Sequence, residues 1–308
     1  MSDYAIETEG LTRFFGKHCA VNELNLKISR GSIFGFLGRN GAGKSTTIRM
    51  LMGLLEPTRG RARVLGRDCT ALTPADRARI GYLAEGHHVY GWMTVRECGD
   101  FQRAFYERWN DEVFHAVLSH FRLDMKTKAG NLSRGQRAGL CLALVLAPEP
   151  ELLVLDDPAL GLDPVARRSL IQSMLYVTRK ADRTILFSSH LLSDVERVAD
   201  EIAVLDRGVL RACCKQDTFR RRVRQFTLRY AGAEPELPAI TGLLQSFRTE
   251  NETSLTVANM SGGEEAALRA LPGVGVEEVA LSLEDAVVSY VSERGEKSFF
   301  TKDLEGVK

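Results

Sequence analysis

The sequence predicts an α/β protein with a parallel sheet, an antiparallel β part and a helical insert, followed by a small C-terminal α+β domain. Short apolar runs at 33–37, 152–155 and 184–187 are typical of buried parallel strands, and helical periodicity follows each of them. After about Ala212 the pattern changes to alternating strands and short helices. We therefore expect two domains, with their boundary near this residue.

A glycine-rich loop follows the first apolar run. It fits the pattern G-x-x-x-x-G-K-[ST] and consists of Gly38, Arg39, Asn40, Gly41, Ala42, Gly43, Lys44, Ser45 and Thr46. Residues 46–55 have helical spacing, so the loop lies between a strand and a helix. The glycines let backbone N–H groups approach an anion, Lys44 places a charge on the outer phosphates, and the Ser45 hydroxyl can bind Mg²⁺. The loop predicts a P-loop NTPase core.

Two adjacent aromatic side chains, Phe14 and Phe15, precede Gly16 upstream of this loop. Neighbouring residues of an extended chain face opposite ways, so we expect one ring in the core and the other exposed. An exposed ring at this point is a platform for a nucleobase, because base stacking contributes about 1–3 kcal/mol.

Charged side chains follow three of the predicted strands. Asp156 and Asp157 follow one strand, Glu85 follows a second and His190 a third. Ligands of open α/β sheets bind at the carboxyl ends of the strands, so we expect these side chains near the nucleotide. Asp156 and Asp157 can organise Mg²⁺ and polarise water. For Glu85 two interpretations stay open: it binds the metal through its oxygens, or it is simply solvated.

Helical periodicity over 94–128 belongs to a helical insert at about 92–146. Thr94 and Glu97 form a capping box at its start. An aromatic stripe at helical spacing predicts a core-facing side, and it consists of Phe101, Phe105 and Trp109. The last helix of the insert opens with the residues Leu132, Ser133, Arg134, Gly135 and Gln136.

The two domains are expected at 1–212 and 213–308. In the second, alternation and helical spacing predict strands at 226–230, 243–249 and 254–258, and helices at 262–271 and 283–291. Basic residues gather at 211–224, which we interpret as a solvated linker helix, with contact to anionic lipid headgroups as the alternative. This domain carries no chemical motif.

Composition and charge argue against several classes of protein. The 308 residues carry a net charge of +1, so no overall attraction to nucleic acid is expected. No apolar run reaches the length of about 18 residues that a membrane span needs, and no signal peptide is visible. The 6 cysteines are scattered, so we expect reduced, mostly buried thiols in a cytoplasmic protein. His87 and His88 have no metal-ligand spacing and are predicted at the surface.

The motifs follow one another in an order that is specific to one family. They are the P-loop at 38–46, the segment 132–136, the acid-ended strand at 152–156, the loop 161–163 and His190. Together they resemble the nucleotide-binding subunit of an ABC transporter over roughly 4–212. The remainder, 218–308, resembles the C-terminal extension of exporter-type ATPases that pair with a separate permease.

The resemblance implies which residues bind ATP. Phe15 corresponds to the aromatic that stacks on adenine, and the loop from Gly38 to Thr46 to the phosphate-binding loop. In the family the segment around Ser133, Gly135 and Gln136 reaches the γ-phosphate bound by a second subunit. The loop 161–163 corresponds to the one that couples the two sites.

The resemblance also implies the catalytic and metal-binding residues. Catalysis would involve Lys44, Glu85, Asp157 and His190, and Mg²⁺ would be held by Ser45, Asp156 and Glu85. Glu85 stands where the family usually has Gln, and Asp157 where it usually has Glu. Asp is one methylene shorter, and a displacement of about 1 Å can lower a rate about 10²-fold, so we expect slow but real hydrolysis.

The expected function is therefore Mg²⁺-dependent ATP hydrolysis between two copies of the chain arranged head to tail, which drives export through a separate permease. The protein would lie in the cytoplasm, on the inner face of the membrane, with ATP and Mg²⁺ as cofactors and no nucleic-acid partner. The alternatives are an ATP-dependent switch with little hydrolysis, a non-transport ABC ATPase that acts on nucleic acid, and an importer subunit.

Overall fold

The computed structural model describes residues 3–179, 183–232 and 235–291, and only the backbone of 175–179. The chain forms two compact units, which are described separately below. The first comprises Met1–His190 and Arg197–Leu210, and the second comprises Leu191–Glu196 and Arg211–Lys308.

A six-stranded sheet of order β10-β9-β3-β8-β7-β6 forms the centre of the first unit. Its strands are β3 (Ile33–Leu37), β6 (Ile80–Leu83), β7 (Leu152–Asp156), β8 (Thr184–Ser189), β9 (Glu201–Asp206) and β10 (Val209–Lys215). The pairs formed by β3, β6, β7, β8 and β9 are parallel. Every residue of β3, β7 and β8 is buried, which explains why the sequence shows continuous apolar runs there.

A second, antiparallel sheet of order β2-β1-β4-β5 precedes it in the chain. Its strands are β1 (Tyr4–Phe15), β2 (His18–Ser29), β4 (Arg59–Val64) and β5 (Arg67–Asp68). The first two are long, because the chain stays extended up to a tight turn in which Gly16 has φ 59°. The pair Phe14-Phe15 therefore lies at the tip of a β-hairpin.

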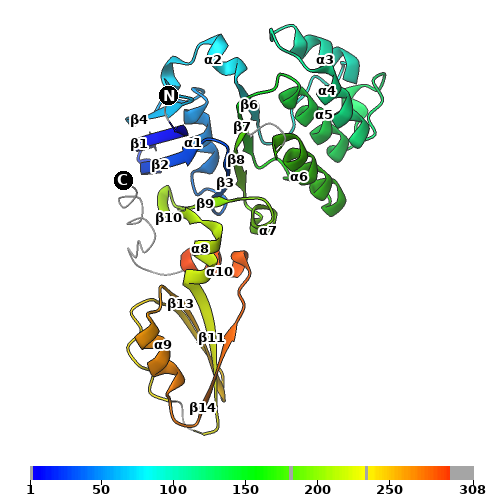
Figure 1. Ribbon diagram of the computed structural model, residues 1–308. Helices are drawn as coiled ribbons and strands as arrows, with labels where there is room; N and C mark the ends of the chain where they lie inside the picture. Colours follow the sequence, from blue (N-terminus) through cyan, green and yellow to red (C-terminus); the bar gives the residue numbers. More distant parts are fainter. Residues whose placement is uncertain (1–2, 180–182, 233–234, 292–308) are drawn as a thin grey trace. The chain divides into compact units, whose positions relative to one another are not determined.

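The helix α1 (Lys44–Leu51) contacts β2 and β4 on one side and β7 on the other, so it lies between the two sheets (Figure 1). We expected it to reach Leu55. It ends earlier because Gly53 takes up the left-handed conformation, with φ 64°, in which a helix terminates. Because the loop before α1 follows β3 directly, it lies at the carboxyl end of the parallel sheet.

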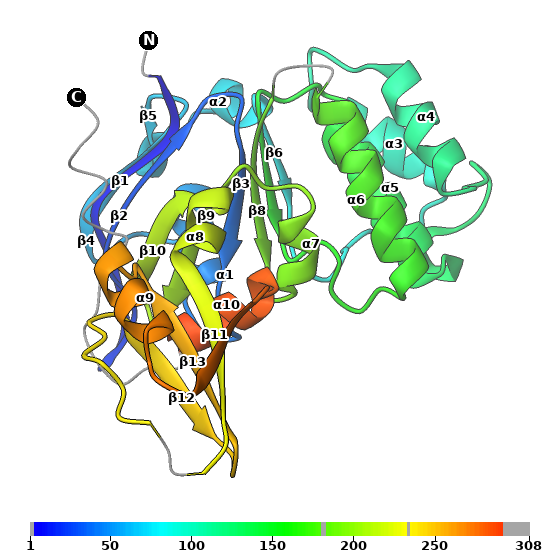
Figure 2. The same ribbon diagram turned by 60° about the horizontal axis from the view of Figure 1, so that its bottom comes forward.

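The helical insert is present, and Figures 1 and 2 show its helices grouped beside the β6 side of the sheet. The helices of the insert are α3 (Val95–Arg103), α4 (Asp111–His120) and α5 (Arg134–Leu146). The helix α2 (Pro74–Ala78) precedes the insert in the chain, and α6 (Pro164–Arg179) follows it. The expected capping box of Thr94 with Glu97 is formed. A second capping box, which was not predicted, is formed by Ser133 with Gln136 at the start of α5. No helix in the described ranges is long and apolar enough to cross a membrane.

The prediction that the aromatic stripe of the insert belongs to the core is wrong. Phe101 is 42% exposed and Phe105 is 69% exposed. The spacing assumed one continuous helix, but α3 ends at Arg103, so Phe105 lies beyond it and Trp109 is only half-buried. The residues that α3 buries are Val95, Cys98 and Gly99.

The second unit is α+β, with a four-stranded antiparallel sheet of order β12-β13-β11-β14. Its elements are α7 (Leu192–Glu196), α8 (Gln216–Arg222), β11 (Val223–Tyr230), β12 (Leu243–Arg248), β13 (Glu252–Ala258), α9 (Gly262–Arg269), β14 (Val274–Val279) and α10 (Leu283–Val291). Its core consists of Phe226, Leu228, Leu255, Val257 and Leu268. Part of the expected domain, 292–308, lies outside the described residues.

Two features of this unit differ from the expectation. The basic stretch is not one linker helix, since it contains the end of β10, the short helix α8 and the start of β11. Arg220 in this stretch pairs with Glu196 at 3.4 Å. The strand β14 was not expected, because its sequence Val-Gly-Val-Glu-Glu-Val is mostly exposed and has little apolar signal. No disulfide joins the 6 cysteines, all of which are among the described residues.

Candidate active site

A cavity of about 390 Å³ lies beside the glycine-rich loop. The residues that line it are Phe15, His18, Ala20, Asn40, Gly41, Ala42, Gly43, Lys44, Ser45, Thr46, Glu85, Asp156, Asp157 and Leu160. The structure thus brings together most of the residues predicted from the sequence, from the hairpin tip, the loop before α1 and the ends of β6 and β7. His18, Ala20 and Leu160 were not predicted; the register pair Phe15–His18 accounts for the first of them.

The loop before α1 is built so that only glycine fits at its tightest point. Gly43 has φ 105°, and a Cβ atom there would lie 2.4 Å from the carbonyl oxygen of Ala20. Gly43 is also the N-cap of α1 and provides no side-chain acceptor, so the first N–H groups of the helix are available to an anion. The backbone geometry is that of a phosphate-binding loop.

Lys44 is buried at the start of α1, and its Nζ donates hydrogen bonds to the carbonyl oxygens of Gly38 (2.7 Å) and Arg39 (3.3 Å). Gly38 and Arg39 therefore hold the lysine instead of lining the cavity. Burial lowers the pKa of Lys44, and the negative charges of Asp157, Asp156 and Glu85 partly oppose this shift. A desolvated ammonium group in this position gains from any anionic ligand that enters the cavity.

Ser45 and Asp156 bring oxygen ligands together on the same side of the cavity. The Ser45 hydroxyl donates to Oδ1 of Asp156 at 3.0 Å, and Asp156 is 2% exposed at the end of β7. Hydroxyl and carboxylate oxygens suit Mg²⁺, which usually takes one or two protein ligands and completes its shell with water and phosphate. Accordingly, the described part of the chain contains no cluster of three or more His, Cys, Asp and Glu that would form an all-protein metal cage.

Asp157 is paired with the predicted histidine. Its Oδ2 lies 2.5 Å from Nδ1 of His190, which donates because the carboxylate can only accept. Its Oδ1 is buried and has no hydrogen-bond partner among the described residues. His190 itself does not line the cavity, so the carboxylate of Asp157 lies between it and the space where a ligand would bind.

Phe15 is the exposed member of the aromatic pair, as expected. Its ring is 48% exposed and lines the cavity, whereas Phe14 is half-buried. The guanidinium carbon of Arg13 lies 4.7 Å from the centroid of the Phe15 ring, a cation–π contact that holds the ring in place. No pattern in the sequence predicts this role of Arg13.

Ser133, Gly135 and Gln136 are not brought to the cavity. They form the start of α5, where the Ser133 hydroxyl accepts from the backbone N–H of Gln136 and the side-chain Oε1 of Gln136 accepts from the backbone N–H of Ser133. Gly135 packs tightly, because a Cβ atom there would lie 2.8 Å from Cβ of Ala166. Within one chain these residues cannot contribute to the same site.

The predicted surface position of His87 is wrong. This residue is only 5% exposed, and its Nε2 donates to the carbonyl oxygen of Pro158 at 2.7 Å. Burial lowers the pKa of His87, which favours the neutral ring, although the bond to Pro158 opposes that shift. The bond ties the loop that carries Glu85 to the loop that follows Asp157.

The fold and the cavity define a P-loop protein in which a lysine and two acids line one cavity. Comparison with known proteins gives the family. A model of the family "ABC transporter" matches residues 21–160. The bacitracin transport ATP-binding protein BcrA of Bacillus licheniformis is 34% identical over 223 residues, which are 72% of this chain and 73% of that protein. The Nod factor export ATP-binding protein I of Bradyrhizobium diazoefficiens is 38% identical over 71% of this chain and 73% of its own length.

Solved structures agree with this assignment. The ATP-binding subunit of an ABC transporter superposes with a TM-score of 0.64 at 28% identity, over 70% of this chain and 92% of that one. A dimeric ATP-binding cassette bound to ADP and Pi shares the fold, with a TM-score of 0.61 at 20% identity over 68% of this chain and 98% of its own. The chain belongs to the family of ABC transporter ATP-binding proteins, and it is an ATPase subunit of that type.

Proposed function

We propose that the chain binds Mg²⁺ and ATP in this cavity and hydrolyses ATP as one half of a head-to-tail homodimer, to drive export through a separate permease. The observation that carries the proposal is the convergence of Lys44, Ser45, Asp156 and Asp157 on one cavity. The export role is supported by the relatives, one of which is named for Nod factor export and another for bacitracin transport.

The residues of the cavity suit the parts of ATP in turn. The exposed ring of Phe15 stacks on the base, the loop before α1 surrounds the phosphates, and Lys44 neutralises their charge. Ser45 and Asp156 would hold Mg²⁺, with Glu85 in reach as a further oxygen ligand, and the bound cation supplies charge to the phosphate oxygens.

Asp157 is the residue that we assign to the attacking water. Oδ2 is held by His190, so the buried Oδ1, which has no partner among the described residues, is the oxygen available to accept the water's proton. His190 holds Oδ2 of Asp157 and so orients the carboxylate. This assignment uses Asp where the family usually has Glu, and slower turnover follows from the shorter reach.

A second copy of the chain completes the site. The start of α5, with Ser133, Gly135 and Gln136, presents a capped helix end that lies away from the cavity of its own chain. In a two-fold dimer each copy offers this segment to the phosphates bound by the other, so both sites close together.

The permease would dock on an exposed aromatic cluster of the insert, formed by Tyr90, Trp92, Phe101 and Phe105. Their exposures are 56%, 68%, 42% and 69%, and neighbouring ring centroids lie 5.2–6.0 Å apart. Contiguous exposed aromatic surface is typical of a site for a protein partner. Through this contact the chain would lie on the cytoplasmic face of the membrane.

The deciding experiment compares ATP turnover among the wild type, Lys44→Ala, Asp157→Asn and Asp157→Glu. Light scattering in the presence of ATP and Mg²⁺ reports the oligomeric state of each protein. We expect no turnover in Lys44→Ala and Asp157→Asn, retained ATP binding in Asp157→Asn, and equal or faster turnover in Asp157→Glu. Persistent turnover in Asp157→Asn would remove Asp157 from the mechanism. A wild type that dimerises on ATP without turnover, alone or with its permease, would favour an ATP-dependent switch.

A further inference from the structure

Ser188 occupies a central position behind the two acids. It lies in β8, between β3 and β7, directly opposite Asp156 in the register of the sheet. Its exposure is 0%, and it does not line the cavity. Burying a hydroxyl without a hydrogen bond costs free energy, so buried hydroxyls are hydrogen-bonded. The partners of Ser188 therefore show which groups it positions.

Ser188 is bonded to both acids. Its Oγ donates to Oδ1 of Asp156 at 2.8 Å and accepts from the backbone N–H of Asp157 at 2.9 Å. The direction of these bonds is fixed, because an N–H group can only donate and the hydroxyl has a single proton to give. That proton therefore points at the carboxylate of Asp156.

The second bond holds a residue in an unfavourable conformation. Asp157 has φ 46°, in the left-handed region that residues other than glycine rarely adopt. Its N–H also approaches the carbonyl oxygen of Ser188 at 3.2 Å, so both bonds that fix this peptide come from one residue of β8. The turn that aims the Asp157 side chain at His190 begins at this peptide.

The first bond acts together with Ser45. The hydroxyls of Ser45 and Ser188 meet the same oxygen of Asp156, at 3.0 Å and 2.8 Å. Ser45 belongs to the nucleotide loop and is itself a proposed cation ligand, whereas Ser188 belongs to the sheet and contacts neither nucleotide nor cavity. Ser188 is therefore the support of Asp156 that does not depend on the ligand.

We infer that Ser188 is a positioning residue that sets both acids at once, orienting the Asp156 carboxylate toward Mg²⁺ and fixing the peptide from which Asp157 reaches the water. The inference rests on the function proposed above. Partners that orient a metal ligand in this way typically contribute about 10–100-fold to metal affinity or activity.

The test uses Ser188→Ala, Ser188→Thr and Ser173→Ala in the full-length chain. Binding of a fluorescent ATP analogue is titrated with Mg²⁺, and separately in EDTA, and ATP turnover is measured beside it. Ser173 is a matched control, since its buried hydroxyl donates to the Ser169 carbonyl in α6, away from the cavity. The comparison of Mg²⁺ with EDTA is internal to each protein, so a general loss of stability does not imitate the effect.

We expect Ser188→Ala to raise the Mg²⁺ concentration for half-saturation and to lower kcat, each by about 10–100-fold, with EDTA binding unchanged. Ser188→Thr, which keeps the hydroxyl, should restore Mg²⁺ dependence, and Ser173→Ala should behave like the wild type. If Ser188→Ala keeps the wild-type Mg²⁺ dependence and kcat and loses only thermal stability, the inference is wrong. A wild type that binds ATP with Mg²⁺ but never hydrolyses it would contradict the proposed function, yet the Mg²⁺ titration would still decide the role of Ser188.

Discussion

Asp157 combines a left-handed backbone with a carboxylate that is bound at one oxygen and has no described partner at the other. Such a conformation costs about 1–3 kcal/mol and persists only where neighbouring bonds impose it. Here they come from Ser188 and from His190. Strain of this kind is typical of reacting groups, and it supports the placing of the water at Asp157.

The buried His87 makes stability depend on pH in the weakly acid range. Its pKa is lowered from 6.5 by burial, while the bond to Pro158 opposes the shift and the charges of Arg137 and His88 add to it. The unfolded chain takes up this proton first, so the free energy of unfolding falls as the pH drops through 6.5 and levels off below the folded-state pKa.

We expect His87→Gln, which keeps a donor for the Pro158 carbonyl, to lose less stability on acidification than the wild type, by up to about 1.4 kcal/mol per pH unit. Urea unfolding at about pH 7.5 and about pH 5.5 measures the difference. His88→Gln, at the exposed neighbouring position, should retain the wild-type loss. If the wild type and His87→Gln lose equal stability on acidification, the pKa of His87 is not lowered by folding, and the prediction is wrong.

At the scale of elements, local patterns were read correctly from the sequence. Gly43 with Lys44, and the capping box at Thr94, act within one turn of the chain, so a short segment contains all the information. The buried strands β3, β7 and β8 were equally clear, because both faces of each are covered and only apolar residues fit.

Elements set by distant contacts were read poorly. The exposure of Phe105 depends on where α3 ends, and the burial of His87 depends on a carbonyl in another loop. The strand β14 forms by pairing with β11, although its own sequence favours it little. For the site, the sequence showed most cavity residues. It did not show Ser188, whose role arises from the pairing of β8 with β7, or the contact that Arg13 makes with Phe15 two residues further along β1.

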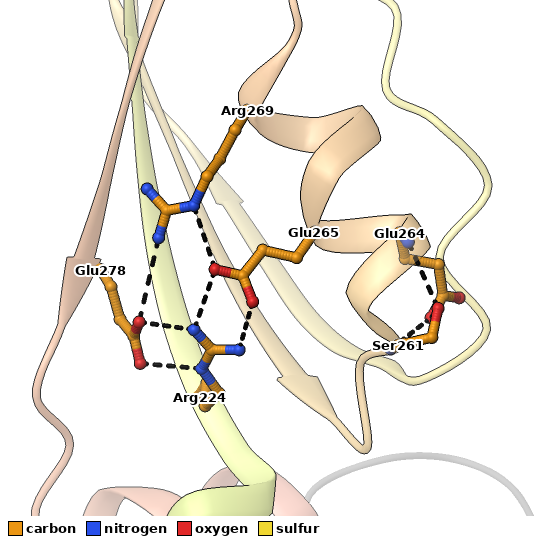
Figure 3. A network of polar contacts seen from close by, with 6 residues as sticks. All are labelled: Arg224, Ser261, Glu264, Glu265, Arg269 and Glu278. Atoms are coloured by element: carbon orange, nitrogen blue, oxygen red, sulfur yellow. Dashed lines mark hydrogen bonds and ion pairs between the residues drawn. The ribbon is translucent and has the colours of Figure 1, made fainter.

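A polar network joins α9 to the sheet of the second unit (Figure 3). Arg224 on β11 donates to Glu278 on β14 through Nε and Nη2, and to Glu265 on α9 through Nη1 and Nη2, with distances of 2.5–3.1 Å. Hydrogen bonds from Arg224 and then Arg269 lower the pKa of Glu265 to about 2. The stability that this shift contributes is fully present at pH values above 4.5, the ordinary pKa of a glutamate, and it is lost as the pH falls toward 2.

We expect Arg224→Met to lower the free energy of unfolding of the second unit by about 1 kcal/mol near neutral pH. The loss should be smaller below about pH 4, because there the carboxylates of the unfolded chain take up protons and the wild type loses the stability that the network provides. Arg224→Lys should recover only part of it, since an ammonium group cannot bridge two carboxylates with paired bonds. Hydrogen exchange of the α9 amides gives the measurement. Arg229→Met removes the ion pairs with Glu252 and Glu277; the Arg229 side chain is 65% exposed, so we expect little change. Equal effects of the two Met variants would contradict a special role for the Arg224 network.

The aromatic cluster of the insert should matter to the permease and not to ATP. We expect Trp92→Ser to leave the turnover of the isolated protein unchanged and to weaken its binding to membranes that contain the permease by at least about tenfold. A sedimentation assay with washed vesicles measures this. Phe247→Ser, at a ring that is 71% exposed in the second unit, is the control and should bind normally. Undiminished binding of Trp92→Ser would place the docking surface elsewhere.

At the scale of the whole molecule, the proposed dimer can be tested without disturbing the fold. Asp caps a helix as well as Ser does, so Ser133→Asp should keep α5 intact while adding a negative charge at the segment offered to the partner's phosphates. In an Asp157→Asn background, we expect monomers with normal ATP binding and no ATP-driven dimer by light scattering. Ser261→Asp makes the same exchange at the same capping box of α9 and should dimerise. Dimers of Ser133→Asp would refute the head-to-tail arrangement.

The short helix α7 follows His190 directly in the chain, yet it belongs to the C-terminal unit. There the Gln216 side chain donates to the carbonyl of Glu196 at 2.9 Å, and α7 contacts α10. For protein engineering this means that the C-terminal unit is discontinuous. A chimera or truncation cut only after Leu210 would leave six residues of the C-terminal unit inside the ATPase unit. An exchange between relatives therefore has to transfer Leu191–Glu196 together with everything from Arg211 onward.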